Sequence, residues 1–452
     1  MPHTVICGAG IAGISTAYHL AIRGVSGILL VDERPPMSLT SDKSTECYRN
    51  WWTGPDDAMV ALVNHSIDLM EKYATQSGNV FHLNRRGYLY LTAEEERIPE
   101  FMRVAAEPSQ LGAGPLRIHR GTSTDPDYIP APHNGYQNHP TGADLFLNPS
   151  GITAHFPYLP DTIRAALHVR RAGWFSAQQL GAYLLDQARS LGVQLRTARV
   201  TGVDVDANRV QAVHLNDGTT IAANCFVNAA GPHARSVGAM LNVELPLFTE
   251  LHLKVAFHDP LGVLPREAPL LIWTDPQTLP WSPEEQTLLA EDPATRRLLQ
   301  PLPGGAHTRP EGGPDSDIML LLWAYQPHRT EPVFPPPLDD LYPEVALRGV
   351  SAILPGLKQY FHRLPQPMVD GGYYTKTREN RPLIGPLPVE GAYIIGALSG
   401  FGMMAGCGAG DLLAAHITGE MLPPYAPAFT LERYNRPGYQ TLLENWPEDG
   451  EL

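Results

Sequence analysis

Residues 3–34 read HTVICGAGIAGISTAYHLAIRGVSGILLVDER, and this stretch decides the fold. An apolar run leads into Gly8, Gly10 and Gly13, a helical pattern follows, and a second apolar run ends at Asp32. Strand, glycine turn, helix, strand and acid form the dinucleotide-binding pattern. In it the glycines allow a tight turn, close approach of a pyrophosphate and close helix packing. The stretch therefore predicts a dinucleotide whose phosphates face the N-terminus of the helix.

The acid after the second strand limits the choice of dinucleotide. Asp32 is placed to accept a hydrogen bond from a ribose hydroxyl. A carboxylate at this position disfavours the 2′-phosphate of NADP, so FAD or NAD fits better. A glycine-rich turn that binds nothing is the alternative that this stretch alone leaves open.

The composition indicates a globular protein with room for two or three domains. The chain has 452 residues, 43% of them hydrophobic, and a formal net charge of −14, which disfavours nucleic acid or an anionic membrane as a partner. No apolar run is long enough to span a bilayer. The four cysteines are far apart without metal-type spacing, and the nucleotide motif begins almost at Met1. We therefore expect no metal, no leader segment and a cytoplasmic location.

A second glycine-rich stretch lies near the other end of the chain. A predicted strand at 392–396 leads into the turn SGFGMM at 399–404, and the helix after it holds Gly406, Gly408 and Gly410. Glycine in a helix costs up to about 1 kcal/mol relative to alanine. The three glycines therefore predict close approach by a ring system or a pyrophosphate, with tight packing on a neighbouring helix as the alternative. Contacts from both ends of the chain indicate FAD rather than NAD.

The remaining segments give coarser predictions. Residues 58–73 show helical spacing, 81–91 alternate like a hairpin, and 93–150 have no regular pattern. In the middle of the chain, 251–257 alternate like a strand, and 282–299 read as a capped amphipathic helix.

Three blocks together resemble the FAD-dependent D-amino-acid oxidase superfamily, in the branch of sarcosine oxidase, glycine oxidase and dimethylglycine dehydrogenase. They are GAGIAG…VDE at 8–33, VNAAG at 227–231, and YYTKTRENRPLIGP…GALSGFGMM at 373–404. The resemblance implies a two-domain α/β fold. A Rossmann-like FAD-binding domain is expected beside a mostly antiparallel β-sheet substrate domain, which forms the cap.

The blocks also predict where the chain passes between these domains. We expect residues 1–88, 151–245 and 366–452 to form a discontinuous FAD-binding domain. The substrate domain is expected to comprise residues 89–150 and 246–365.

The resemblance implies oxidation of the C–N bond of a secondary amine or amino acid. Hydride would pass to flavin N5, and the imine would then hydrolyse. The electron acceptor would be O₂ or another carrier. A flavin hydroxylase or NAD(P)H-dependent reductase, and a non-catalytic flavin-bound assembly protein, remain alternatives.

Carried over by position, the resemblance assigns cofactor contacts along the whole chain. They are Gly8, Gly10, Ile11, Ala12, Gly13, Asp32, Glu33, Arg34, Ser44, Thr45, Val200, Ala230, Gly231, Gly372, Gly396, Ser399, Gly400, Phe401, Gly402, Met403 and Met404. The cysteine that holds flavin covalently in sarcosine oxidase falls at Gly372, and no histidine occurs between His19 and His65. We therefore expect non-covalent FAD.

The resemblance also names candidates for substrate binding. Arg49 matches an arginine that helps bind the substrate carboxylate in sarcosine oxidase-like enzymes, and a guanidinium fork suits a carboxylate. The lysine that shares this carboxylate falls at Met404, so a larger, less acidic or more apolar substrate, or another anchor, is expected. The lysine that promotes reaction with oxygen belongs near 320–323, where this chain has none. A dehydrogenase is therefore an open alternative to an oxidase.

Four further side chains are candidates for the pocket. His252 and Lys254 share one side of the strand predicted at 251–257, where a cation would anchor substrate or stabilise reduced flavin. A solvated outer face is the alternative for both. Tyr48 and Tyr374 are candidates to close the pocket over the substrate, with plain packing as their alternative.

Overall fold

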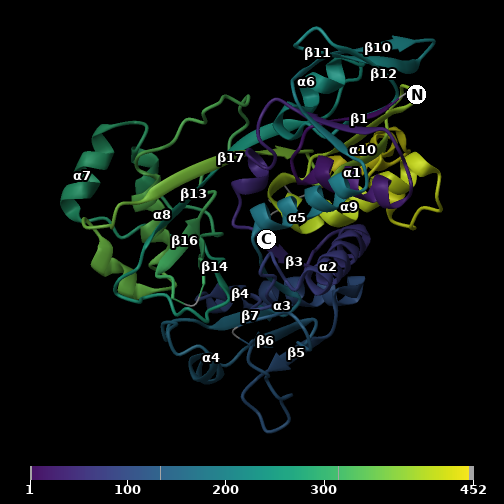
Figure 1. Cartoon of the computed structure of the whole chain (residues 1–452). Coiled ribbons are helices and arrows are strands. Elements are labelled where there is room, and N and C mark those ends of the chain that lie inside the picture. The colour runs from purple at the N-terminus through teal and green to yellow at the C-terminus, as the bar shows by residue number, and fades with distance from the viewer. Residues whose placement is uncertain (1–2, 133, 314, 447–452) are drawn as a thin grey trace.

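The computed structural model describes residues 3–132, 134–313 and 315–446. Two large β-sheets lie side by side, and helices cover the first of them (Figure 1). The C-terminal segments lie beside the N-terminal helix α1, and α1 packs directly on α9. No helix in these described ranges is long and apolar enough to cross a membrane.

The first sheet has eight strands, in the order β10-β11-β12-β1-β2-β9, with β19 beside β12 and β18 beside β19. Pairing is parallel between β12, β1, β2 and β9 and between β12 and β19, whereas β10, β11 and β12 are antiparallel. The strands are β1 (His3–Cys7), β2 (Ile28–Asp32), β9 (Gln194–Thr197), β10 (Val200–Asp206), β11 (Arg209–Leu215), β12 (Thr220–Asn228), β18 (Leu383–Pro386) and β19 (Ala392–Gly396).

The second sheet has nine strands, in the order β17-β13-β16-β15-β14-β4-β7-β6-β5. Its pairs are antiparallel except β14 with β4 and β5 with β6. A separate ribbon joins β3 (Cys47–Arg49) to β8 (Ala172–Trp174). The sheet strands are β4 (Tyr88–Thr92), β5 (Leu116–His119), β6 (Ala143–Phe146), β7 (Ala165–Val169), β13 (Phe248–His258), β14 (Leu270–Trp273), β15 (His307–Pro310), β16 (Ile318–Leu322) and β17 (Met368–Lys376).

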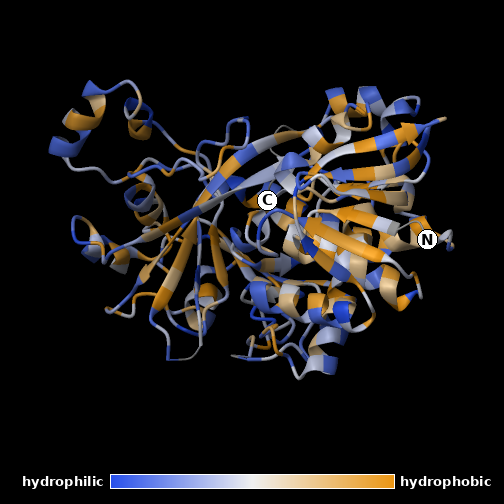
Figure 2. Ribbon diagram, turned by 45° about the horizontal axis from the view of Figure 1, so that its top comes forward, coloured by the Kyte–Doolittle hydropathy of each residue, from blue (hydrophilic) through white to orange (hydrophobic). Residues whose placement is uncertain are grey.

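Helices complete the two layers. Helices α1 and α9 pack on the first sheet, α2 packs on α9 and α5 on α1, and α8 packs on β13 and β16 of the second sheet. Many strands in both sheets are apolar, while the outer helices carry both apolar and polar residues (Figure 2). The helices are α1 (Ile11–Ile22), α2 (Ala58–Ser77), α3 (Ile98–Pro108), α4 (Pro149–His155), α5 (Ala177–Ser190), α6 (Ala234–Ala239), α7 (Pro283–Glu291), α8 (Tyr342–Val350), α9 (Gly402–Thr418) and α10 (Tyr439–Glu444).

The architecture confirms the expected α/β fold with a mostly antiparallel second sheet. Two of the expected segment limits do not match the strand pairing. Strand β7 falls within the segment 151–245, and β17 within 366–452, yet both pair in the nine-stranded sheet. The motifs mark only the strands that carry glycine turns, so they do not reveal that the chain leaves the second sheet only after β7 and after β17.

Several local predictions were wrong. Residues 81–87 form no strand, so β4 is not half of the hairpin expected at 81–91. The region 93–150, in which the sequence pattern places no elements, contains α3, β5 and β6. The helix expected at 282–299 ends at Glu291, even though its capping box between Ser282 and Glu285 is present. A short 3-10 turn then follows.

The glycines of α9 serve helix packing, so the prediction of a ligand beside them was wrong. A Cβ on Gly406 would lie 2.8 Å from Cγ1 of Ile11 in α1, and one on Gly408 would lie 2.9 Å from the carbonyl oxygen of Leu62 in α2. A Cβ on Gly410 would collide with Ser15. The tight-packing alternative therefore explains all three.

Candidate active site

The turn between β1 and α1 requires glycine. Gly8 has a φ of 114°, in the left-handed region, and a Cβ there would collide with the carbonyl oxygen of Ala229. A Cβ on Gly13 would collide with the carbonyl oxygen of Gly8, so Gly13 lies beneath the turn and lets α1 pack against it. The backbone N–H of Ile11 donates to Oγ of Ser41 at 3.1 Å. The first turn of α1 thus sits against the loop that follows β2.

Asp32 fixes this turn from the end of β2. Its Oδ2 accepts from the backbone N–H of Ala9 at 2.7 Å, and its Oδ1 accepts from that of Arg34 at 2.9 Å. The carboxylate of Glu33 lies 3.7 Å from Arg199. Both carboxylates line the first cavity, at the place where a ribose is expected.

A first cavity of about 420 Å³ lies at the carboxyl ends of β1, β2, β12 and β19. Ligands of open α/β sheets bind at this edge. Sixteen of the predicted cofactor contacts line the cavity. They are Gly8, Gly10, Ile11, Ala12, Asp32, Glu33, Arg34, Ser44, Val200, Ala230, Gly231, Gly396, Ser399, Gly400, Gly402 and Met403.

Five predicted cofactor contacts lie elsewhere. Besides Gly13, Gly372 packs on Lys43, with a hypothetical Cβ only 2.7 Å from the lysine Cβ. Thr45, Phe401 and Met404 line a second cavity instead of the first. Position in the sequence did not reveal these differences, because adjacent residues of one turn face different cavities.

The second cavity has a volume of about 1580 Å³ and meets the first at Tyr374, Ser399 and Gly400, which line both. Aromatic and apolar side chains form much of its wall. They include Trp52, Tyr88, Tyr90, Trp273, Phe401 and Met404. A molecule in this cavity therefore lies beside whatever occupies the first.

Arg49 is the buried cation of the second cavity. Its side chain is 7% exposed, and its guanidinium carbon lies 4.2 Å from the ring centroid of Trp52. Its Nη1 donates to the carbonyl oxygen of Trp51. A guanidinium stacked on indole is held in one plane, which suits two parallel hydrogen bonds to a carboxylate.

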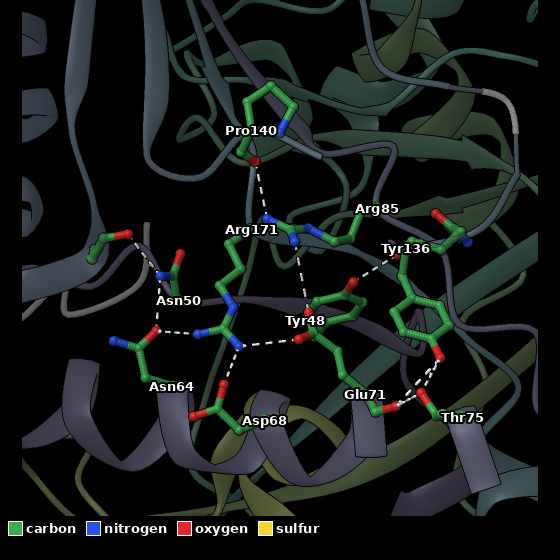
Figure 3. Close-up of polar contacts among 12 residues, drawn as sticks. Tyr48, Asn50, Asn64, Asp68, Glu71, Thr75, Arg85, Tyr136, Pro140 and Arg171 are labelled. Carbon is green, nitrogen blue, oxygen red and sulfur yellow. Dashed lines mark hydrogen bonds and ion pairs between the residues drawn. The ribbon is translucent and has the colours of Figure 1, made fainter. Parts of the chain in front are cut away.

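A polar network behind β3 fixes the backbone that carries Arg49 (Figure 3). Asn50 donates through Nδ2 to Oδ1 of Asn64 at 2.9 Å, and Arg171 donates through Nη1 to the same oxygen at 3.1 Å. Asp68 also pairs with Arg171. The network ties the β3–β8 ribbon to α2, so it positions Arg49 from behind.

Tyr48 belongs to this supporting side and not to the pocket, so its expected role over the substrate was wrong. It is fully buried, lines neither cavity, and donates through its hydroxyl to the carbonyl oxygen of Asn84 at 2.7 Å. Burial raises the pKa of Tyr48 well above its ordinary value. Neighbouring residues of a strand point to opposite faces, so Tyr48 points away from the cavity that Arg49 lines.

His252 lines the second cavity, as expected, and the outer-face alternative fails because it is 3% exposed. Its ring stacks on Tyr374, and its Nε2 lies 3.3 Å from Oε2 of Glu250. Lys376 lies 3.1 Å from the same oxygen. Burial alone would raise the pKa of Glu250, but the hydrogen bond from His252 and the charge of Lys376 lower it to about 2.

Lys254 lines neither cavity, so its expected contact with substrate or flavin was wrong. Its Nζ donates to the carbonyl oxygens of Asp42 at 2.8 Å and Ser44 at 3.1 Å. Burial lowers the pKa of Lys254. The side chain therefore holds the loop whose Ser44 faces the first cavity and whose Thr45 faces the second.

Sequence reasoning missed most of the aromatic wall. Tyr88 and Tyr90 both line the second cavity from β4, and the alternation YLYL placed them on one face of a strand. That signal was available in the sequence. Trp273, at the end of β14, had no comparable signal, because the pairing of β14 with β4 brings together residues far apart in the chain.

The residues of the first cavity fit FAD. The glycine turn leaves backbone space for a pyrophosphate, and carboxylates stand where a ribose is expected. Ser399 lies where the two cavities meet, has a left-handed backbone with φ 44°, and has a buried Oγ with no partner among the described residues. An unpaired buried hydroxyl in a strained turn suits a polar ligand group. No cluster of potential metal ligands occurs in the ranges described.

The family pattern of the FAD dependent oxidoreductases, abbreviated DAO, matches residues 3–416. The chain belongs to this family. It is therefore an FAD-dependent oxidoreductase related to amine and amino-acid oxidases and dehydrogenases.

Individual relatives are more distant. Mitochondrial sarcosine dehydrogenase of Mus musculus is 26% identical over 265 residues, which cover 56% of this chain and 25% of that protein. Mitochondrial dimethylglycine dehydrogenase of Rattus norvegicus is 28% identical over 273 residues, which cover 59% of this chain and 28% of that protein. These matches thus span about a quarter of the curated relatives.

Solved structures share the fold along nearly the whole chain. L-proline dehydrogenase from P. horikoshii superposes with a TM-score of 0.73 at 20% identity, covering 96% of this chain and 99% of that one. Glycine oxidase from Geobacillus kaustophilus superposes with a TM-score of 0.71 at 17% identity, covering 95% of this chain and 98% of that one. At such identities the likeness concerns the fold alone.

Proposed function

We propose that this protein oxidises the C–N bond of a secondary amine or amino acid whose carboxylate binds Arg49. One observation carries the proposal: a buried arginine lines a cavity that meets the first cavity at Tyr374, Ser399 and Gly400. The relatives named for sarcosine, dimethylglycine, proline and glycine support this substrate class.

The residues of this chain would act by binding and orientation. When bound, FAD supplies a hydride acceptor. Arg49 would hold the substrate carboxylate, and the aromatic wall would exclude water from the reacting C–N bond. Tyr374, fixed by His252, would border the substrate where the cavities meet. If the amine binds in its neutral form, no dedicated base is needed, and the imine product hydrolyses in water.

We further propose that FAD is bound without a covalent link. Gly372 stands at the position of the attaching cysteine, and it packs on Lys43 outside the first cavity. Flavin should therefore appear in the supernatant when the protein is denatured with acid. Flavin that stays with the precipitated chain would refute this.

The domain division and the location also remain proposals. The eight-stranded sheet with its helices would form the FAD-binding domain, and the nine-stranded sheet the substrate domain. A cytoplasmic location is proposed as well, although the two curated relatives are mitochondrial by name. The electron acceptor is O₂ or another carrier, and β16 holds no lysine to promote reaction with O₂.

The test is anaerobic mixing of the purified flavoprotein with N-methylated and free amino acids while flavin absorbance is recorded. Bleaching by any of them supports the proposal, and admitting air then separates an oxidase from a dehydrogenase. Absence of bleaching by all of them, with normal reduction by dithionite, would overturn it. Bleaching by NADH instead would favour a reductase or hydroxylase.

A further inference from the structure

The second cavity is much larger than a small N-methyl amino acid requires. Its volume of about 1580 Å³ exceeds the roughly 300–1,000 Å³ usual for pockets that bind drug-sized molecules. Arg49 and the three residues shared with the first cavity make up only a small part of its lining. The rest of the wall is available to a longer substrate.

The lining of this cavity is cationic although the whole chain is acidic. Among the residues that the structure describes, six arginine or lysine side chains line it, against three carboxylates, while the net charge of the chain is −14. The cations are Arg49, Arg97, Arg235, Arg329, Lys376 and Arg378. The carboxylates are Glu244, Glu250 and Glu331. A local excess of one sign attracts ligands of the other.

Three of these cations are already paired. Arg97 lies 2.9 Å from the buried carboxylate of Asp275, Arg235 lies 3.3 Å from Glu331, and Lys376 lies 3.1 Å from Glu250. They add little attraction for a ligand.

Arg329 and Arg378 are different. Within the part of the chain that the structure describes, neither guanidinium has a carboxylate at ion-pair distance. Both side chains are exposed, whereas Arg49 is buried. The cavity thus has the buried Arg49 on one side and two exposed arginines, Arg329 and Arg378, that have no acidic partner among the described residues.

The two exposed arginines lie near the same end of the β13–β17 pair. Phe248 pairs with Lys376 across these strands, and Arg378 follows two residues later. The guanidinium carbon of Arg329 lies 4.0 Å from the ring centroid of Phe248. Stacking on an aromatic ring restricts the guanidinium, so less freedom is lost when it binds an anion.

Building on the function proposed above, we propose that the substrate carries a second carboxylate, at the far end of its N-substituent or side chain. Arg329 and Arg378 bind this distal carboxylate while Arg49 binds the one beside the reacting C–N bond. The connecting chain lies along the aromatic wall that includes Trp52 and Tyr90. The substrate class is therefore an extended dicarboxylic amino acid or N-(carboxyalkyl) amino acid.

The first experiment compares two series of increasing length, N-alkylglycines and N-(carboxyalkyl)glycines, by anaerobic stopped-flow reduction of the flavin. For each pair of equal length we compare the rate constant of flavin reduction divided by the apparent dissociation constant. At the best length we expect this ratio to be at least about tenfold higher for the acid-ended compound than for the alkyl compound. The advantage should fall toward one in the double variant R329Q/R378Q and at high salt. The matched control Arg120→Gln removes an exposed arginine that lines neither cavity, so it should leave the advantage intact.

The second experiment measures binding without turnover. Thioether analogues, in which sulfur replaces the amine nitrogen, are titrated with and without a distal carboxylate and followed by calorimetry. The distal carboxylate should tighten binding to the wild type about tenfold and have little effect on R329Q/R378Q.

The outcomes separate this inference from the proposed function. Equal reduction by acid-ended and alkyl compounds, with equal thioether binding, would overturn the inference and leave amine oxidation intact. Absence of reduction by every amine, together with arginine-dependent binding of the dicarboxylic thioether, would support the distal site and overturn amine oxidation. Thioether binding that is insensitive to both arginines would overturn the inference in either case.

Discussion

The imidazole of His252 stacks on the phenol ring of Tyr374, with ring centroids 4.0 Å apart and planes inclined by 16°. Glu250 holds the imidazole from its edge, and Gly400 lies against the phenol. Tyr374 is therefore confined on both sides at the point where the two cavities meet.

Adding a side chain at Gly400 should disturb this junction. A Cβ there would lie 2.5 Å from Cε2 of Tyr374, and the stacked ring cannot move away toward His252. Overpacking of this kind costs about 1–3 kcal/mol. We expect Gly400→Ala to weaken FAD binding at least about fivefold, measured by fluorescence titration of the apoprotein. Tyr374→Ala in the same chain should restore part of the affinity, and an unchanged single variant would contradict the geometry.

The turn at Gly8 offers a test of the cofactor site itself. Gly8→Ala combines a left-handed φ with a collision against Ala229, whereas Gly24 has a φ of 80° and open space around its Cβ position. Both variants bear the backbone strain of about 1–2 kcal/mol, but only Gly8→Ala bears the collision. We expect Gly8→Ala to be purified without flavin and Gly24→Ala to retain it. Equal flavin content, measured by absorbance per chain, would argue against the assigned turn.

Arg49 should affect substrate affinity far more than cofactor content. Truncating one partner of a buried charge pair costs about 2–5 kcal/mol, so Arg49→Gln should lower kcat/KM at least about 30-fold. Arg49→Lys should recover only part of this, since lysine lacks the planar fork. Steady-state kinetics with an amino-acid substrate measures both. Arg103→Gln, at an exposed arginine outside both cavities, should behave like the wild type.

The second sheet contains a buried carboxylate whose contribution depends on pH. Asp144 lies 2.7 Å from Arg117, 3.0 Å from His119 and 2.6 Å from Arg170. Burial alone would raise the pKa of Asp144, but these hydrogen bonds hold it well below its ordinary value. The contribution of the ionised Asp144 carboxylate to the stability of the folded protein is therefore fully present above about pH 4, and it is lost as the pH falls further.

Replacing this carboxylate tests the linkage. At pH 7, Asp144→Asn should lower the free energy of unfolding by about 3–5 kcal/mol, because Arg170 is left buried without its partner. The difference from the wild type should shrink as the pH falls below about 4. Urea unfolding at several pH values measures this. Glu390→Gln, in an exposed ion pair with Arg209, should change stability little at any pH.

The first cavity was predictable because its decisive features are local. The turn at Gly8, the acid at Asp32 and the turn at 399–404 each follow a strand within a few residues. Parallel strands then bring their carboxyl ends to one edge of the sheet. Local order in the sequence was therefore enough to place most of the first cavity.

The second cavity was harder to predict because strand pairing builds it from distant segments. Arg49 and Tyr48 are neighbours in a three-residue strand, and only its pairing with β8 decides which of them reaches the cavity. Lys254 shares a strand face with His252, yet its side chain donates hydrogen bonds to carbonyl oxygens of the loop at 42–44 and does not reach the cavity. Position on a strand indicates a face, but neighbouring loops decide what that face contacts.

The first cavity takes its walls from residues 7–44, 198–240 and 374–403. A growing chain on the ribosome acquires the glycine turn at 8–13 first and the closing turn at 399–404 almost four hundred residues later. Domains form in the order of synthesis only where their parts are contiguous. The cavity that would hold FAD is therefore complete only after residue 403 has been synthesised. Until then α1 and α2 lack the helix α9, on which both of them pack.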